Sequence, residues 1–269
     1  MQKAFINGKI IDGTKDMSVM SGKCIITANG IITDIINESE FKKPEGCEVI
    51  DLKGRYIMPG LINMHVHLAG SGKPQKKQRD NAKLVSFLLG NPITSKIAYK
   101  MVQGFAKDEL MSGVTTIRCM GGLSNFDSKT RDEINAGKID GPRILASNEG
   151  ISVPNGHMAG SVAIAANSIE EALEHMDRQS KDKIDLVKIM VTGGVLDAKE
   201  KGVPGELKMK PEMIKAVCDK AHKEGYIVAA HAESPEGVKV ALQNGVDSIE
   251  HGAKLDDETI KLFKDRGAF

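Results

Sequence analysis

The sequence lacks an excess of charge of either sign. Its 269 residues include 37 basic and 36 acidic side chains, which gives a formal net charge of +1 at pH 7. Proteins that bind nucleic acids or membrane surfaces electrostatically carry a basic excess or a basic patch. The totals therefore indicate neither a nucleic-acid nor a membrane partner, and they favour a small-molecule substrate.

Long apolar runs and a secretory signal are also missing. No stretch of 18 apolar residues occurs, and the N-terminus has no apolar core followed by a small-residue cleavage site. Cysteine is scarce and shows no CxxC spacing; the four are Cys24, Cys47, Cys119 and Cys218. These features predict a cytoplasmic protein with free thiols and disfavour metal binding by thiolates. What is present, 41% hydrophobic and 27% charged residues, is typical of a globular protein with a large core.

Residues 1–57 form a pattern of short apolar runs separated by turns. Asn7-Gly8 and Asn29-Gly30 each lie between two such runs, and Asn-Gly in that position is a strong β-hairpin signal. We therefore expect two hairpins in a small β-unit over residues 1–57. A unit of this size would be marginal alone, so we expect it to pack on another part of the protein.

From residue 58 onward, predicted strands alternate with predicted helices, which indicates an α/β fold with a parallel sheet covered by helices. We expect six β/α units, with strands near residues 61–67, 114–118, 143–146, 186–190, 226–230 and 248–250, and helices near 92–111, 128–137, 168–180, 211–224, 235–244 and 256–265. Six units fit either an open doubly wound sheet or a TIM-type (β/α)8 barrel cut short. No GxGxxG follows the first strand, and neither Gly121-Gly122 nor Gly193-Gly194 makes a phosphate-binding fingerprint, so we favour the barrel for residues 58–269.

Four histidines lie at the ends of predicted strands. His65 and His67 are two residues apart, so a strand directs both imidazoles to one face. His231 and His251 end the fifth and sixth strands, and the active sites of barrel enzymes gather at these carboxyl ends. Taken alone, His65 and His67 could equally be two surface histidines near a turn, and His231 and His251 are each more often structural residues of a buried strand than ligands. Together they indicate a metal site, because a bound cation accounts for convergent imidazoles.

Lys188 lies within the apolar run of residues 186–190. An unpaired ammonium is costly to bury, and burial lowers the pKa of the amine. A neutral lysine can react with carbon dioxide to form a carbamate, an anionic oxygen donor able to bridge two metal ions. The alternative, a lysine whose amine reaches solvent at the end of the strand, stays open at this point.

Five segments together resemble the amidohydrolase superfamily, and within it the imidazolonepropionase-like branch that includes Xaa-Pro dipeptidases. They are PGLINMHVH at 59–67, GVTTIR at 113–118, VKIMVTGG at 187–194, AHAE at 230–233 and GVDSIEHG at 245–252. The likeness covers nearly the whole chain. It implies a barrel joined to a small β-sandwich domain, which would correspond to residues 1–57.

The resemblance also implies a set of site residues and a reaction. His65 and His67 would bind one metal ion, His231 and His251 a second, and carboxylated Lys188 would bridge them, with zinc as the expected ion. The expected reaction is hydrolysis of an amide bond in a dipeptide or related small amide by a metal-bound hydroxide, with Lys188 and His231 in the catalytic set. His157 and Arg118 are expected to bind substrate, although a solvated loop histidine and a structural ion pair are the competing interpretations.

Two departures from the family pattern qualify this expectation. Cys119 follows Arg118 where the family usually has aspartate, and the aspartate that the family places after the eighth strand has no counterpart before Phe269. We therefore expect a fragment of a longer protein. The unpaired edges of its incomplete barrel could pair with another chain, including a second copy of this one. The alternatives are a cyclic-amide hydrolase or deaminase with one metal ion, and a metal-binding scaffold without activity.

Overall fold

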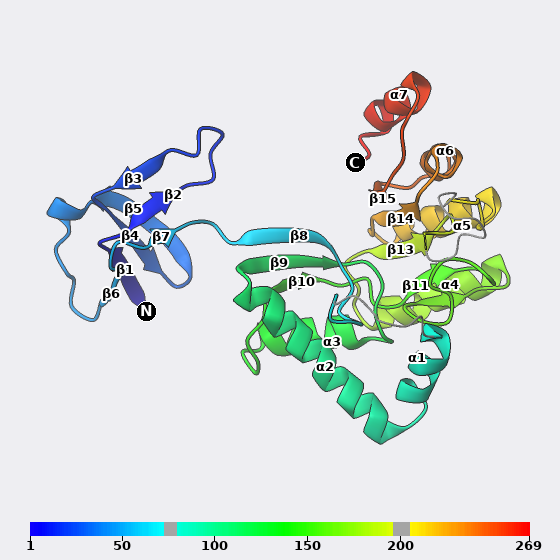
Figure 1. Cartoon of the computed structure of the whole chain (residues 1–269), viewed down its shortest axis with the longest axis horizontal. Helices are drawn as coiled ribbons and strands as arrows, with labels where there is room; N and C mark the ends of the chain where they lie inside the picture. The colour runs from blue at the N-terminus through cyan, green and yellow to red at the C-terminus, as the bar shows by residue number, and fades with distance from the viewer. Residues whose placement is uncertain (73–79, 196–204) are drawn as a thin grey trace. The chain divides into compact units, whose positions relative to one another are not determined.

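A computed structural model describes residues 1–72, 80–195 and 205–269, and divides the chain into two compact units (Figure 1). The first unit spans Met1–Gly60 and the second spans Leu61–Phe269.

The first unit consists of two small sheets. A four-stranded sheet has the order β5-β4-β1-β6, and a three-stranded sheet has the order β3-β2-β7. Ala4, Cys24, Ile26 and Cys47 form its buried core. The elements are β1 (Gln2–Ile6), β2 (Lys9–Ile11), β3 (Val19–Ser21), β4 (Lys23–Ala28), β5 (Ile31–Asn37), the 3-10 helix η1 (Glu38–Glu40), β6 (Glu48–Asp51) and β7 (Tyr56–Ile57).

One of the two predicted hairpins is confirmed and the other is wrong. β4 and β5 pair antiparallel across Asn29-Gly30, whose φ angles of 53° and 81° are those of a tight hairpin turn. At Asn7-Gly8, by contrast, β1 pairs with β4 and β6, whereas β2 pairs with β3 and β7. Asn7 has φ 54° and donates its side-chain amide to Asp51, so the chain bends there into the other sheet.

The second unit alternates strands and helices. Its strands are β8 (Leu61–Val66), β9 (Val114–Cys119), β10 (Arg143–Leu145), β11 (Gly150–Ser152), β12 (Ala163–Ala165), β13 (Val187–Met190), β14 (Val228–Ala232) and β15 (Ser248–His251). Its helices are α1 (Asn81–Leu89), α2 (Pro92–Met111), α3 (Phe126–Asn135), α4 (Ile169–Lys181), α5 (Pro211–Lys223), α6 (Pro235–Gln243) and α7 (Asp257–Arg266). The six predicted helices correspond to α2–α7, and α1 is additional.

All strand pairs in the second unit are parallel. The orders are β10-β9-β8 and β12-β11-β13-β14-β15. The α/β class with parallel sheets is confirmed, and within the described ranges the strands do not close into a barrel. The third predicted strand corresponds to β10, which pairs with β9. Two further strands follow that were not predicted: β11 pairs with β13, and β12 pairs with β11. Asn148, with φ 54°, lies between β10 and β11.

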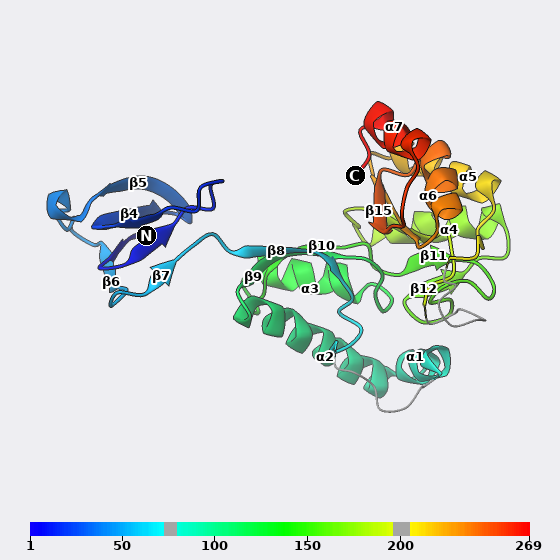
Figure 2. The same ribbon diagram turned by 45° about the horizontal axis from the view of Figure 1, so that its top comes forward.

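Helices cover the sheets with apolar faces. In Figure 2, α2 and α3 lie beside β8, β9 and β10, and α4 to α6 accompany the strands from β11 to β15. On α5 the buried residues Met213, Ile214, Val217, Cys218 and Ala221 follow the spacing of a single helix face. They join the largest buried cluster, which includes Ile189 of β13 and Ala230 of β14. Among the described helices, none combines the length and apolar content needed to span a bilayer.

Candidate metal centre

The sheet topology gathers the strand-end residues at one place. Neighbouring strands β13, β14 and β15 are in register, with Met190 opposite His231 and Ala232 opposite His251. Their carboxyl ends therefore meet, and the rings of His65 and His251 approach to 4.7 Å between centroids across β8 and β15. Ring contacts run from His67 through His65, His251 and His231 to His157, with centroid separations of 4.0–5.1 Å.

His65 and His67 direct the same nitrogen at one point. Their Nε2 atoms are 3.2 Å apart. The Nδ1 atom of His65 lies 2.8 Å from Oε2 of Glu250, and Nδ1 of His67 lies 2.9 Å from the carbonyl oxygen of Gly121. A carboxylate and a carbonyl only accept, so both rings must donate from Nδ1. Two Nε2 lone pairs therefore face each other, an arrangement that a shared cation stabilises.

Three histidines of the cluster, His67, His231 and His251, are held neutral. Burial lowers the pKa of His67 to about 4 and that of His231 to about 2, and burial again lowers the pKa of His251 to about 4. Nearby positive charge adds to each shift, including the Lys188 amine. Neutral imidazole is the form that binds metal ions, so at pH 7 these three side chains are already in their ligand state.

Lys188 is a buried amine without a partner. Its side chain is 2% exposed, and Nζ has no hydrogen-bond partner among the described residues. Burial lowers its pKa to about 7; Glu250 opposes this shift and Arg118 adds to it. The interpretation of Lys188 as a lysine that reaches solvent is therefore wrong. An amine with a lowered pKa, close to the imidazoles of His67, His231 and His251, has the chemistry that carbamate formation requires.

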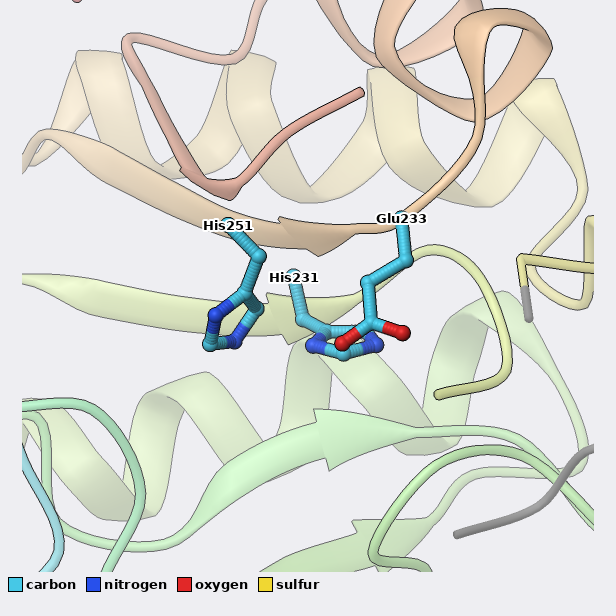
Figure 3. Close-up of side chains that lie close together, drawn as sticks. All are labelled: His231, Glu233 and His251. Carbon is cyan, nitrogen blue, oxygen red and sulfur yellow. The ribbon is translucent and has the colours of Figure 1, made fainter. Parts of the chain in front are cut away.

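His231, Glu233 and His251 form a second potential ligand group, shown in Figure 3. Nitrogen or oxygen atoms from the three side chains all lie within 4.8 Å of one another, and the figure shows the side chains converging from the ends of β14 and β15. Oε2 of Glu233 is buried without a hydrogen-bond partner in the described part of the chain. The backbone of His251 has φ 70°, an unusual conformation for a residue other than glycine and one often found at functional sites.

Two glycines allow the backbone to approach the imidazoles closely. A Cβ atom at Gly194 would lie 2.6 Å from the ring of His157 and 3.2 Å from that of His231. Gly121 has φ 119°, and a Cβ atom there would lie 3.6 Å from His67 and 3.1 Å from the Val162 carbonyl oxygen. The two Gly-Gly pairs that make no phosphate-binding fingerprint therefore shape the histidine cluster instead.

The two residues expected to bind substrate have different settings. His157 is half-buried and stacks on His231, with an interplanar angle of 8° and a centroid distance of 4.0 Å. Arg118 is 6% exposed, and its guanidinium donates to Glu250, Ser248 and the Met64 carbonyl oxygen. This placement gives His157 access to the cluster and favours an ion-pair role for Arg118.

Sequence reasoning did not identify Glu250 or Glu233. Glu250 is 5% exposed and contacts His65. In the sequence it is only a polar residue before His251, and nothing local indicates this contact. Glu233 follows His231 by two residues, so the alternation of a strand places both side chains on one face. That spacing, the same as in His65 and His67, was an available signal.

The donor set fits divalent cations. Imidazole nitrogens suit zinc and other transition metals, and a buried carboxylate oxygen without a partner is a further ligand. Beside His65 and His67 lies a cavity of about 500 Å³, partly lined by Leu88 and Phe105, a size usual for small-molecule sites.

Comparison with known proteins gives the family. The model of the amidohydrolase family matches residues 56–269. The structure of a putative prolidase from Bifidobacterium longum is 36% identical, with a TM-score of 0.77 over 98% of this chain and 57% of that one. A Xaa-Pro dipeptidase with bound methionine in its active site is 31% identical, with a TM-score of 0.78 over all of this chain and 66% of that one.

A curated relative, ochratoxinase from Aspergillus niger, is 25% identical over 235 residues, which is 78% of this chain and 46% of that protein. The chain thus spans about half the length of the curated relatives it matches. The family match covers most of the chain and includes every histidine of the cluster. The chain belongs to the amidohydrolase family, with prolidase-like structural neighbours.

Proposed function

We propose that this protein hydrolyses an amide bond of a small molecule, with an Xaa-Pro-like dipeptide as the expected substrate, and that it does so with divalent cations. The observation that carries the proposal is the facing pair of Nε2 atoms, 3.2 Å apart, on two rings whose Nδ1 atoms are committed to acceptors. The prolidase and Xaa-Pro dipeptidase neighbours support the substrate class. We further propose that the parallel sheets represent six units of a TIM-type barrel.

Five side chains would hold the cations. His65 and His67 would hold one, His231 and His251 a second, and Lys188, carboxylated by carbon dioxide, would lie between them; zinc is the expected metal. Bound there, the cations would supply Lewis acidity that polarises an amide carbonyl and activates water. His231 and Lys188 would thus belong to both the ligand and the catalytic sets.

The protein's own residues prepare the site for this chemistry. Burial keeps His67, His231 and His251 neutral, so these three imidazoles need not lose a proton before a cation binds. The surrounding strands exclude water from Lys188 and His231, which are 2% and 1% exposed. His157, stacked on His231, would contact the substrate at the open side of the cluster.

The test measures metal content and hydrolysis together. The purified chain is loaded with zinc or manganese, its metal content is measured per chain, and it is assayed with Xaa-Pro dipeptides, other dipeptides and cyclic amides. We expect bound metal and hydrolysis to be lost together in His65→Ala and His231→Ala. His222→Ala is the matched control, because His222 lies on α5 and pairs with Asp247.

Unchanged metal content in both site variants would contradict the ligand assignment. Metal binding without hydrolysis of any substrate would contradict the proposed activity. One ion per chain, with activity on cyclic amides or amines only, would favour the cyclic-amide hydrolase or deaminase interpretation over the dipeptidase.

A further inference from the structure

The carboxylate of Glu250 lies buried between three strands. Its side chain is 5% exposed, on β15 next to His251. Oε1 accepts from Arg118 at 2.7 Å and from the Ser248 hydroxyl at 2.8 Å, whereas Oε2 accepts from Nδ1 of His65 at 2.8 Å. One oxygen is thus held by the protein scaffold, and the other is presented to a single imidazole.

Arg118, on β9 beside β8, links Glu250 to the backbone of β8. On β9, its Nη2 donates to Glu250 and its Nη1 to Ser248 at 3.2 Å, both on β15. Its Nε donates at 2.8 Å to the carbonyl oxygen of Met64, the residue before His65 on β8. β8 and β15 are not paired by backbone hydrogen bonds in the described ranges, so these side chains connect the two strands that carry His65 and His251.

We propose that Glu250 is the positioning residue for His65 and that Arg118 fixes Glu250 for this task. The carboxylate accepts from Nδ1, so it sets the tautomer and the rotation of the ring and aims the Nε2 lone pair at that of His67. This inference rests on the proposed function, because it assigns His65 to a cation. Glu250 itself does not contact substrate in this role.

The neighbouring ligand shows why His65 depends on a side chain. His67 donates from Nδ1 to the main-chain carbonyl of Gly121, an acceptor that no substitution of a side chain removes. His65 has only the Glu250 carboxylate at its Nδ1 in the described structure. A change at Glu250 should therefore alter the tautomer and ring orientation of His65 and leave the tautomer of His67 unchanged.

Two variants separate positioning from a structural role. Glu250→Gln keeps the size of the side chain but replaces one of its two acceptor oxygens by an NH2 group. The variant side chain therefore cannot accept hydrogen bonds from both Arg118 and His65 on separate oxygens. Ser248→Ala, the matched control, removes a hydroxyl bonded to the same carboxylate while leaving the bond between Oε2 and His65 in place. If the network is only a structural connection, both variants should affect the site in the same way.

The first measurement uses the metal-free protein. Histidine ring nitrogens are labelled with ¹⁵N in chelator-treated protein, and the His65 signals are assigned by their loss in His65→Ala. We expect the Nδ1–H tautomer for His65 in the wild type and in Ser248→Ala, and a mixture with the Nε2–H tautomer in Glu250→Gln. An Nε2–H tautomer in the wild type would overturn the proposal even if Glu250→Gln failed to fold.

The second measurement is the zinc affinity of the same three proteins by competition with a chelating dye. We expect Glu250→Gln to bind zinc about 10- to 100-fold more weakly, the usual range for loss of a carboxylate behind a histidine ligand, and Ser248→Ala to stay within about threefold of the wild type. Equal affinity in Glu250→Gln, or an equal loss in Ser248→Ala, would overturn the positioning role. Because both readouts are independent of turnover, a protein that hydrolyses no amide can still confirm this inference, and the two failures are distinguishable.

Discussion

Replacing Lys188 by methionine should stabilise the metal-free protein and weaken its metal binding. The amine is 2% exposed and Nζ has no partner among the described residues, so its charged form is disfavoured in the folded chain. Methionine has a similar length and no charge to bury. Because Lys188→Met removes this buried charge, we expect it to raise the free energy of unfolding of the metal-free protein.

The magnitude follows from the pKa of the amine. Burial lowers the pKa of Lys188 from 10.5 to about 7, a difference that corresponds to about 5 kcal/mol. Below pH 7 both the folded and unfolded chains are protonated, so the full penalty is present. Between pH 7 and 10.5 the folded chain has lost the proton and the unfolded chain has not, so the penalty falls by about 1.4 kcal/mol per pH unit. Relaxation and water penetration recover part of it, so we expect a gain of about 2–4 kcal/mol at pH 6.

The assay is urea unfolding followed by circular dichroism at 222 nm, in chelator and carbonate-depleted buffer. All α-helices of the described residues lie in the second unit, so this signal reports on the unit that contains Lys188. Lys215→Met is the control, because Lys215 is 63% exposed and pairs with Asp219 on the surface of α5. Its effect should stay within about 0.5 kcal/mol.

Three outcomes would refute this reasoning. A Lys188→Met chain no more stable than the wild type at pH 6 would show that the buried amine is compensated. A gain that did not diminish between pH 7 and 10 would show that protonation is not its cause. Unchanged zinc content in Lys188→Met would remove this residue from the ligand set.

Three further changes test other parts of the molecule. Asp127 is fully buried, and burial raises its pKa from 3.8 to about 7, opposed only by its interaction with the Cys119 thiol. In the unfolded chain this carboxyl therefore ionises at a lower pH than in the folded chain. Asp127→Asn should become progressively more stable than the wild type between pH 4 and 7, with no gain below pH 4. In urea unfolding at pH 8 the gain should reach up to about 4 kcal/mol. His251→Ala should lower the zinc content measured by mass spectrometry, and equal loss in His222→Ala would show a global rather than a local effect. Ile214→Ala, at a position with no exposure in the largest buried cluster, should cost about 2–5 kcal/mol in the same unfolding assay. A cost below about 1 kcal/mol would contradict close packing of Ile214 in this cluster.

The elements with strong sequence periodicity were predictable. The helix expected near 92–111 is α2, and the helices expected near 211–224 and 235–244 are α5 and α6, each with proline in its first turn. α1, which is nine residues long and has no fully buried residue, was missed. β11 and β12 were missed because three residues are too few to show an alternation.

Turn signals were less reliable than the helix pattern. Asn29-Gly30 and Asn7-Gly8 have the same two residues between apolar runs, yet only the first joins paired strands. At Gly8 a Cβ atom would lie 2.4 Å from the Leu52 side chain, so the glycine there allows a close contact with a segment 44 positions away. Such a contact depends on tertiary packing, which the local sequence does not contain.

The same limit applies within the site. Four histidines, His65, His67, His231 and His251, could be proposed as ligands because each lies at the end of a strand, and the ends of parallel strands meet by topology alone. Glu250 could not be identified in this way, because its partners Arg118 and His65 are 132 and 185 positions away. The candidate ligands are therefore predictable from strand order, whereas the residues proposed to orient them depend on side-chain packing between strands.

The arrangement of the cluster explains why a cation, rather than a proton, should occupy it. Two Nε2 lone pairs 3.2 Å apart repel each other unless a positive charge lies between them. A proton could serve, but burial lowers the pKa of His67 to about 4, so His67 does not take up that proton at neutral pH. A divalent cation brings twice the charge and binds lone pairs from several rings at once, which a single proton cannot do. The burial that makes the metal-free site costly is thus the same feature that keeps protons from competing for it.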